Sequence, residues 1–193
     1  RMASMARDMV RESIDVFCRL SRKKIPHILQ MEEFLDALEK EINQYLQELS
    51  QHSLTRQQTT IVSGILSAAN DLERIGDHAR NIAHCAELVM EDKLHVTDSA
   101  RREVYSFYEK VDGMIAKAIS ALAEENVELA EEVIRDDDLV DEMERILRKS
   151  HIERVNRKEC VPAAGVIYLD ILSNLERIAD HSTNLAQVVK GEF

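Results

Sequence analysis

The sequence is poor in residues that interrupt helices or build aromatic clusters. Its 193 residues include two prolines, five glycines, no tryptophan and only 4% aromatic residues. The apolar residues are mainly Leu, Ile, Ala, Val and Met, and charged residues make up 32% of the chain. This composition is typical of long helices. Because no segment alternates polar and apolar residues with a period of two, no strands are predicted.

Positive charge is also scarce. Lysine and arginine number 25 against 36 acidic residues, which gives a net charge of −11. This balance argues against binding of nucleic acids or anionic membranes by bulk electrostatics, and it favours cations or a basic protein partner. The three cysteines are far apart and form no C-x-x-C pair, which is typical of reduced thiols in a cytoplasmic protein. No apolar run approaches the roughly 18 residues that a membrane span needs, and no signal peptide is recognised.

Apolar periodicity and capping residues predict six helices. Their approximate ranges are 2–21, 28–52, 55–91, 97–126, 127–157 and 162–190. The segment SRKKIPH, which contains Pro26, is expected to separate the first two helices. Pro162 suits the first turn of the sixth.

A repeated phrase divides the chain into two similar halves. LERIGDHARNIA, beginning at Leu72, recurs as LERIADHSTNLA, beginning at Leu175, with eight of twelve positions identical. EEFLDAL in the second helix likewise corresponds to DDLVDEM in the fifth. Helices two and three therefore recur as helices five and six. This predicts an all-α fold of two repeated antiparallel three-helix bundles side by side, 1–95 and 96–193, within a single domain of residues 1–193.

The repeated helices carry paired carboxylates outside their apolar stripes. On a helical wheel each pair lies four residues apart on one face, away from the core. Like charges at this spacing repel by a few tenths of a kcal/mol, and a bound cation would reverse that sign. Carboxylates from neighbouring helices supply the oxygen ligands that hard cations prefer. A solvated acidic face is the alternative. The candidate metal ligands are Glu32, Asp36, Glu73, Asp77, Asp137, Asp141, Glu176 and Asp180.

At these residues the chain resembles the PhoU family, whose members carry phrases such as DLERIGDHAxNIA. Residues 71–83 read DLERIGDHARNIA, and the second copy departs from the phrase without losing either motif carboxylate. The resemblance implies a two-bundle fold and a regulatory role in phosphate transport. It also implies metal ions on the motif carboxylates: an iron cluster, or alternatively manganese, zinc or magnesium.

Within that family the sequence is similar to PhoU-like domains attached C-terminally to sodium/phosphate cotransporters. This similarity rests on the segment SRKKIPH, which interrupts the first two helices, and on the start of the sequence at Arg1. It implies a cytoplasmic domain tethered to the inner face of the membrane. Two alternatives stay open: a free-standing PhoU-type regulator of the phosphate regulon, and a metal-free acidic helical docking module. The expected partner is a membrane phosphate transporter, in the same polypeptide or separate, or a signalling kinase; a homodimer stays open.

Other residues are assigned structural roles, and no catalytic residues are proposed. No Glu has a His three residues later, as the di-iron carboxylate bundles require, and no His-Asp dyad occurs. The protein is therefore predicted not to be an enzyme. His78 and His181 are expected at the edge of the core with satisfied hydrogen bonds, Arg74 and Arg177 in ion pairs with nearby acids, and Asn81 and Asn184 in hydrogen bonds to ligating carboxylates.

Overall fold

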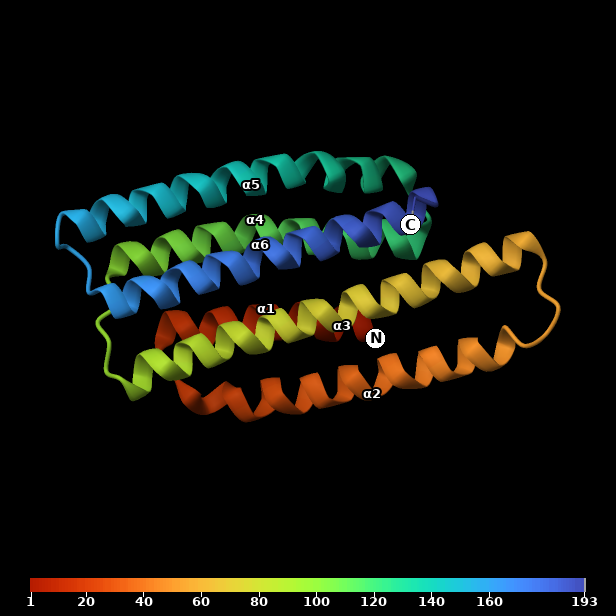
Figure 1. Ribbon diagram of the computed structural model, residues 1–193, viewed down its shortest axis with the longest axis horizontal. Coiled ribbons are helices and arrows are strands. Elements are labelled where there is room, and N and C mark those ends of the chain that lie inside the picture. Colours follow the sequence, from red (N-terminus) through yellow and green to blue (C-terminus); the bar gives the residue numbers. More distant parts are fainter. Residues whose placement is uncertain (193) are drawn as a thin grey trace.

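The computed structural model describes residues 1–192, which form helices joined by short connections (Figure 1). The absence of strands in this range confirms the predicted all-α class. The elements are α1 (Met2–Arg19), the short 3-10 helix η1 (Arg22–Lys24), α2 (Ile25–Leu49), α3 (Arg56–Glu91), α4 (Asp98–Glu124), α5 (Val127–Asn156) and α6 (Pro162–Lys190). None of these helices combines the length and apolar character needed to cross a membrane.

Side-chain caps fix where three of the helices begin. Thr55 and Gln58 form a capping box at α3, in which the Thr55 hydroxyl accepts a hydrogen bond from the Gln58 N–H. Thr97 and Asn126 accept equivalent bonds at α4 and α5. These side chains satisfy backbone N–H groups that have no partner within the helix.

The connection between α1 and α2 differs from the prediction. α1 ends at Arg19, where Leu20 adopts a left-handed conformation with φ 47°. α2 already begins at Ile25, so the predicted start at residue 28 was wrong. Pro26 lies in the first turn of α2, where its missing N–H has no helical partner to lose.

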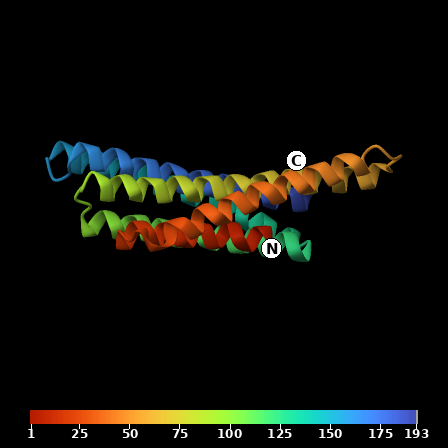
Figure 2. The ribbon, with the colours of Figure 1, turned by 90° about the horizontal axis from the view of Figure 1, so that it is seen from below.

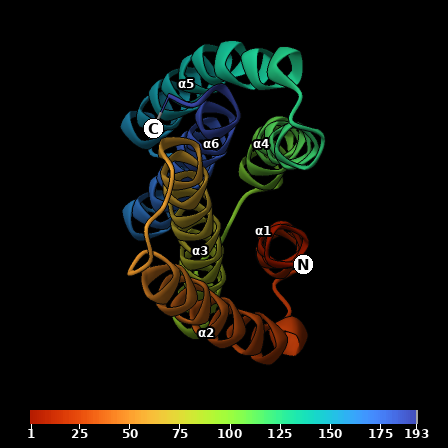
Figure 3. The ribbon, with the colours of Figure 1, turned by 90° about the vertical axis from the view of Figure 1, so that its right-hand side faces the viewer.

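The helices form two antiparallel three-helix bundles, as predicted. α1–α3 make one bundle and α4–α6 the other (Figure 1). Seen from one end, α2, α3, α6 and α5 form a curved layer, with α1 and α4 on one side of it (Figure 3). Figure 2 shows α3 and α6 lying above α1 and α4. The bundles meet where α3 packs on α6 and α1 on α4.

One apolar core runs through both bundles. The apolar residues that share one face of α3 are buried, and Ile75 and Ile82 among them are fully enclosed. On α6, Leu175 and Ile178 are equally buried and belong to the same cluster. Since α3 and α6 turn their apolar stripes into this shared core, their acidic faces are left at the flanks, toward α2 and α5.

Candidate metal centre

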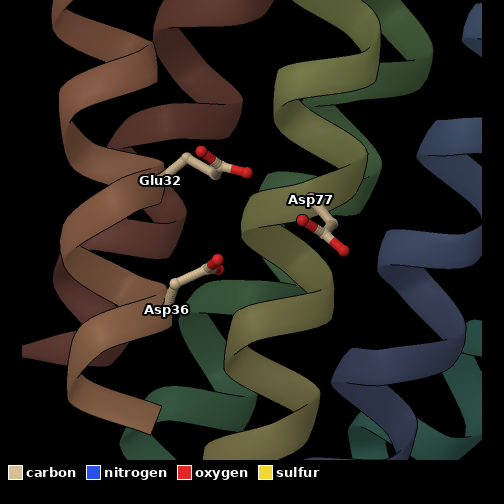
Figure 4. Close-up of side chains that lie close together, drawn as sticks. All are labelled: Glu32, Asp36 and Asp77. Atoms are coloured by element: carbon tan, nitrogen blue, oxygen red, sulfur yellow. The ribbon is translucent and has the colours of Figure 1, made fainter. Parts of the chain in front are cut away.

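Three carboxylates of the first repeat point toward one another between α2 and α3. Glu32 and Asp36 come from successive turns of α2, and Asp77 faces them from α3 (Figure 4). One oxygen of each lies within 4.8 Å of the others. Glu73 lies one turn before Asp77, and its pKa responds to the charges of Asp77 and Asp36. The structure therefore brings the first-repeat candidates into one neighbourhood, with three of them converging.

Burial makes this arrangement electrostatically unfavourable without a counter-charge. Only 15% of the Glu32 side chain and 19% of the Glu73 side chain are exposed. Burial raises the pKa of Glu32, and the neighbouring carboxylates add to this effect. Burial also raises the pKa of Glu73, followed by repulsion from Asp77. A cation between the carboxylates would relieve both effects, because opposite charge favours the ionised form.

Two arginines supply part of that counter-charge. Arg80 Nε lies 3.2 Å from Glu32 Oε1, and Arg74 Nη1 lies 3.6 Å from Asp77 Oδ2. The attraction of Arg80 lowers the pKa of Glu32 against the effect of burial. The predicted ion pair of Arg74 is confirmed. Sequence reasoning did not predict the role of Arg80. Its position in the sequence offers little signal, because it is the position written x in the phrase DLERIGDHAxNIA.

The four acidic candidates of the second repeat lie near one another but do not converge as closely. Burial raises the pKa of Asp137, the neighbouring Thr183 hydroxyl lowers it, and repulsion from Asp180 and Asp141 raises it further. Burial likewise raises the pKa of Glu176. Within residues 1–192, however, the first-repeat trio is the one acidic group whose oxygens meet within 4.8 Å. The predicted ion pairs of Arg177 are confirmed, because it lies 3.1 Å from Asp180 and 3.6 Å from Glu176.

The second repeat also lacks the half-exposed arginine of the first. Thr183 stands at the position that corresponds to Arg80, and Asp137 corresponds to Glu32. In the described part of the chain, Asp137 Oδ1 and Thr183 Oγ1 are both buried and without a hydrogen-bond partner. A buried carboxylate oxygen without a partner is costly. The first site thus has the closer oxygens and an arginine beside Glu32, whereas a neutral hydroxyl stands beside Asp137 in the second.

Comparison with known proteins identifies the family that shares this architecture. A family model described as the PhoU domain matches residues 1–86 and 104–189, one segment in each half of the chain. The chain belongs to the PhoU family. The resemblance of the repeated phrase to PhoU proteins is thereby confirmed.

Relatives of this PhoU-family chain include a Thermotoga maritima protein named "Phosphate-specific transport system accessory protein PhoU homolog 1". The two are 27% identical over 190 residues, which is 98% of this chain and 81% of the relative. The crystal structure of PhoU from Pseudomonas aeruginosa matches with a TM-score of 0.91 and 21% identity, covering 97% of this chain and 90% of that one. The phosphate transport system regulatory protein PhoU from Streptococcus pneumoniae gives a TM-score of 0.86 at 19% identity, covering 97% and 87%. At these identities the two structures show the fold alone.

These matches favour one of the alternatives drawn from the sequence. The names refer to accessory and regulatory proteins of phosphate transport systems, so the PhoU-type regulator fits better than a domain attached to a sodium/phosphate cotransporter. The attachment to a cotransporter stays a prediction.

The donor set of this PhoU-family chain fits a hard cation. All eight candidate ligands are carboxylates, which suit magnesium, manganese or iron. Zinc more often takes nitrogen or sulfur ligands as well. The converging trio on α2 and α3 and the partnerless oxygen of Asp137 are the two observations that support a fit.

A second polar cluster lies at the contact of α3 and α6. His78 Nδ1 is 2.9 Å from Asn174 Oδ1, and His181 Nδ1 is 2.9 Å from Asp71 Oδ1. The expectation of satisfied histidines is confirmed. Asn184 donates to Asp71 at 2.9 Å, so its predicted hydrogen bond to a candidate ligand was wrong. Asp71 is 3% exposed, and sequence reasoning missed its role at the contact between the two repeats.

Proposed function

We propose that this protein is an accessory regulator of a phosphate transport system that works by docking rather than by catalysis. The observation that carries the proposal is the PhoU-domain match in both halves of the chain. The names of the relatives support the link to phosphate transport. The site of action would be the cytoplasmic face of the membrane, and the partner a transport protein or a signalling kinase. Attachment to a sodium/phosphate cotransporter is the narrower form of the same proposal.

Metal binding is the second part of the proposal. Glu32, Asp36, Glu73 and Asp77 would hold one cation or cluster between α2 and α3. The corresponding Asp137, Asp141, Glu176 and Asp180 would hold another between α5 and α6. A bound cation would supply positive charge, and iron, manganese or magnesium suits these oxygens best. The carboxylates would then draw α2 against α3 and α5 against α6, so that the outer faces are presented rigidly to a partner.

Phosphate uptake in cells tests the regulatory role. The gene would be deleted in its own organism, and uptake of radiolabelled phosphate would be measured in phosphate-rich and phosphate-poor medium. We expect deletion to change the dependence of uptake on external phosphate and the intact gene to restore it. Unchanged uptake under both conditions would contradict the regulatory role.

Elemental analysis tests the metal sites separately. The protein would be purified without chelator or nickel resin and compared with Asp77→Asn combined with Asp180→Asn. We expect metal in the parent and a loss of metal in the double variant, with the helical circular dichroism spectrum unchanged. Glu33→Gln is the matched control, because this exposed acid adjoins Glu32 in the sequence but is not in the trio. A metal-free parent after anaerobic reconstitution would favour the metal-free docking module.

A further inference from the structure

Basic residues gather at one end of this acidic protein. The left end in Figure 1 contains the connections from α1 to α2, from α3 to α4 and from α5 to α6. Residues 19–27, 91–103 and 154–162, called the basic end below, hold ten Lys and Arg residues against five Asp and Glu residues. The remainder of the chain therefore carries more than the whole net negative charge of −11.

The segment between α1 and α2 contributes most of this positive charge. Residues 19–27 contain four basic residues and no acidic one, and the three side chains of η1 are exposed. Lys24 lies 3.0 Å from Asp15 of α1, and Arg22 lies 3.4 Å from Glu91 of α3. These pairs neutralise part of the charge and leave the rest facing solvent.

Four basic side chains at the basic end have no acidic partner in the part of the chain that the structure describes. No carboxylate oxygen there lies within 4.0 Å of Lys23, Lys93, Arg102 or Lys158, and all four residues are exposed. They come from η1, from two of the connections and from the first turns of α4. Because no ion pair within the protein uses them, these charges are free to face an external anion.

Exposed apolar side chains lie at the same end. Ile152, Val161 and Val166 are 50%, 53% and 60% exposed, and Leu29 of α2 is 44% exposed. Val161 lies in the connection between α5 and α6, and the other three lie within the last or first five residues of their helices. Apolar side chains among basic ones are typical of surfaces that bind anionic lipid, because the apolar groups enter the headgroup region while the basic groups attract the lipid charges.

The length of the molecule separates this end from much of the acidic charge. α3 alone has 36 residues, which make a helix of about 54 Å. Charges in 0.15 M salt are screened over a Debye length of about 8 Å. When the basic end approaches a surface first, its own charges therefore dominate the interaction. The net charge of the protein argues against binding an anionic membrane, whereas the distribution of that charge favours it.

We propose that the basic end docks on the anionic lipid of the cytoplasmic leaflet, with the helices directed away from the membrane. The exposed apolar side chains favour a lipid surface over an acidic protein, which would attract the basic residues alone. The choice of the cytoplasmic leaflet rests on the proposed function. Docking in this orientation holds the acidic flanks of the bundles away from the negative lipid surface.

Sedimentation with sucrose-loaded vesicles tests the docking directly. The full chain of 193 residues would be mixed with vesicles of phosphatidylcholine containing about 30% phosphatidylglycerol, or with vesicles of phosphatidylcholine alone, at 0.15 M salt. We expect saturable binding to the anionic vesicles and at least tenfold weaker binding to the neutral ones. Raising the salt to about 0.5 M should release the protein, because it shortens the screening length.

A charge variant locates the binding at the basic end. Lys23→Gln combined with Lys93→Asn and Lys158→Asn removes three unpaired charges. Asparagine suits the last two positions, where φ is 50° and 61°, because it tolerates left-handed backbone. Each basic side chain near an anionic surface strengthens binding by about fivefold. We therefore expect at least tenfold weaker binding by this variant, with an unchanged helical circular dichroism spectrum.

The matched control changes the net charge equally at exposed positions outside the basic end. Lys40→Gln, Arg56→Gln and Lys110→Gln together should keep the parent affinity within about threefold. Equal binding by the parent and the first variant would overturn the proposal. Equal loss of binding by both variants would show an effect of net charge alone, which overturns the assignment to the basic end.

An apolar variant separates a lipid surface from an acidic protein. Ile152→Gln combined with Val166→Gln should weaken vesicle binding at least threefold. Leu139→Gln combined with Ile146→Gln changes α5 side chains that are 68% and 57% exposed, and this control should bind as the parent does. If the first pair also binds as the parent does, the surface recognises negative charge alone, and the assignment to lipid is overturned in favour of an acidic protein.

The vesicle and uptake experiments fail separately. If deletion of the gene alters phosphate uptake but the protein does not bind anionic vesicles, the membrane docking is overturned and the regulatory function stands. If the protein binds the vesicles through the basic end but deletion leaves uptake unchanged, the regulatory function is overturned and the lipid-binding surface stands.

Discussion

At the scale of single residues, the two repeats balance the same acidic pairs in different ways. The first repeat sets Arg80 against Glu32, and the second has Thr183 beside Asp137. The repeated acid-x-x-x-Asp spacing was sufficient to predict which carboxylates share a neighbourhood. Spacing along one helix says nothing about side chains that cross from another, so neither the role of Arg80 nor the closer convergence of the first trio could be predicted.

Replacing Arg80 should strengthen cation binding at the first site. Arg80→Thr gives α3 the residue found at the same place in α6 and removes a positive charge 3.2 Å from Glu32. We expect the affinity for Mn²⁺ to rise about tenfold, which corresponds to roughly 1.4 kcal/mol. Isothermal titration calorimetry of the chelator-treated protein measures this affinity. Arg145→Thr removes an exposed arginine from α5 and should change nothing; weaker binding by Arg80→Thr would show that the arginine organises the ligands.

The raised carboxylate pKa values predict how stability depends on pH without metal. Glu32, Glu73, Asp137 and Glu176 have folded-state pKa values above their ordinary values of 4.5 for Glu and 3.8 for Asp. The folded protein therefore binds more protons than the unfolded chain in this range, and the free energy of unfolding falls as pH rises through it. The destabilisation is complete above the folded-state pKa values and absent below the ordinary ones.

Neutral substitutions isolate this contribution. The four changes Glu32→Gln, Glu73→Gln, Asp137→Asn and Glu176→Gln remove the charges at nearly constant size. In chelator, the variant should be more stable than the parent at pH 7, and the difference should shrink as pH falls toward 4. Thermal melts at both pH values give the difference. A difference that does not vary with pH would mean that the substitutions act through packing alone.

At the scale of elements, the contact between α2 and α3 depends on a glycine. A Cβ atom added at Gly76 would lie 2.6 Å from Leu35 Cδ1 of α2, a side chain that is 1% exposed. The sequence showed Gly76 only as part of a repeated motif. Its role in letting α2 lie close to α3 became visible only in the structure. Helix ends were largely predictable from caps, whereas the start of α2 was missed because Pro26 suits a first turn as well as a break.

Two glycines with different surroundings test this element. Gly76→Val should destabilise the protein by about 1–3 kcal/mol, because the added side chain overpacks the contact with Leu35. Gly113→Ala, exposed within α4 and with nothing within 4 Å of the added Cβ, should stabilise it by roughly 0.5–1 kcal/mol through helix propensity. Urea unfolding measures both. Equal effects of the two changes would refute the spacer role of Gly76.

At the scale of the whole molecule, the two bundles are joined by a shared core, by an ion pair between Arg7 of α1 and Asp112 of α4, and by the polar cluster around Asp71. The duplication visible in the sequence predicted two bundles side by side. It did not predict their contact, since the polar partners lie 96–113 residues apart. Asp71 accepts hydrogen bonds from His181 and Asn184, and its counterpart Asn174 lies in hydrogen-bond contact with His78. Each repeat thus places a residue at this position against a histidine of the other repeat, but the residue is a charged carboxylate in the first repeat and a neutral amide in the second.

Removing the carboxylate of Asp71 should weaken this contact. Asp71→Ala leaves His181 and Asn184 without their acceptor in a buried place, and we expect a loss of about 2–4 kcal/mol from the free energy of unfolding. Asp71→Asn keeps an acceptor oxygen, as Asn174 does in the other repeat, and should cost less than about 1 kcal/mol.

Asp138→Ala provides the matched control, because it brings the same gain in helix propensity at an exposed position of α5 and should stay within about 0.5 kcal/mol of the parent. Urea unfolding followed by circular dichroism ranks the three variants. If Asp71→Ala matches the control, the hydrogen bonds to Asp71 contribute nothing to joining the bundles. If its transition separates into two steps, the cluster is what makes the two halves unfold as one unit.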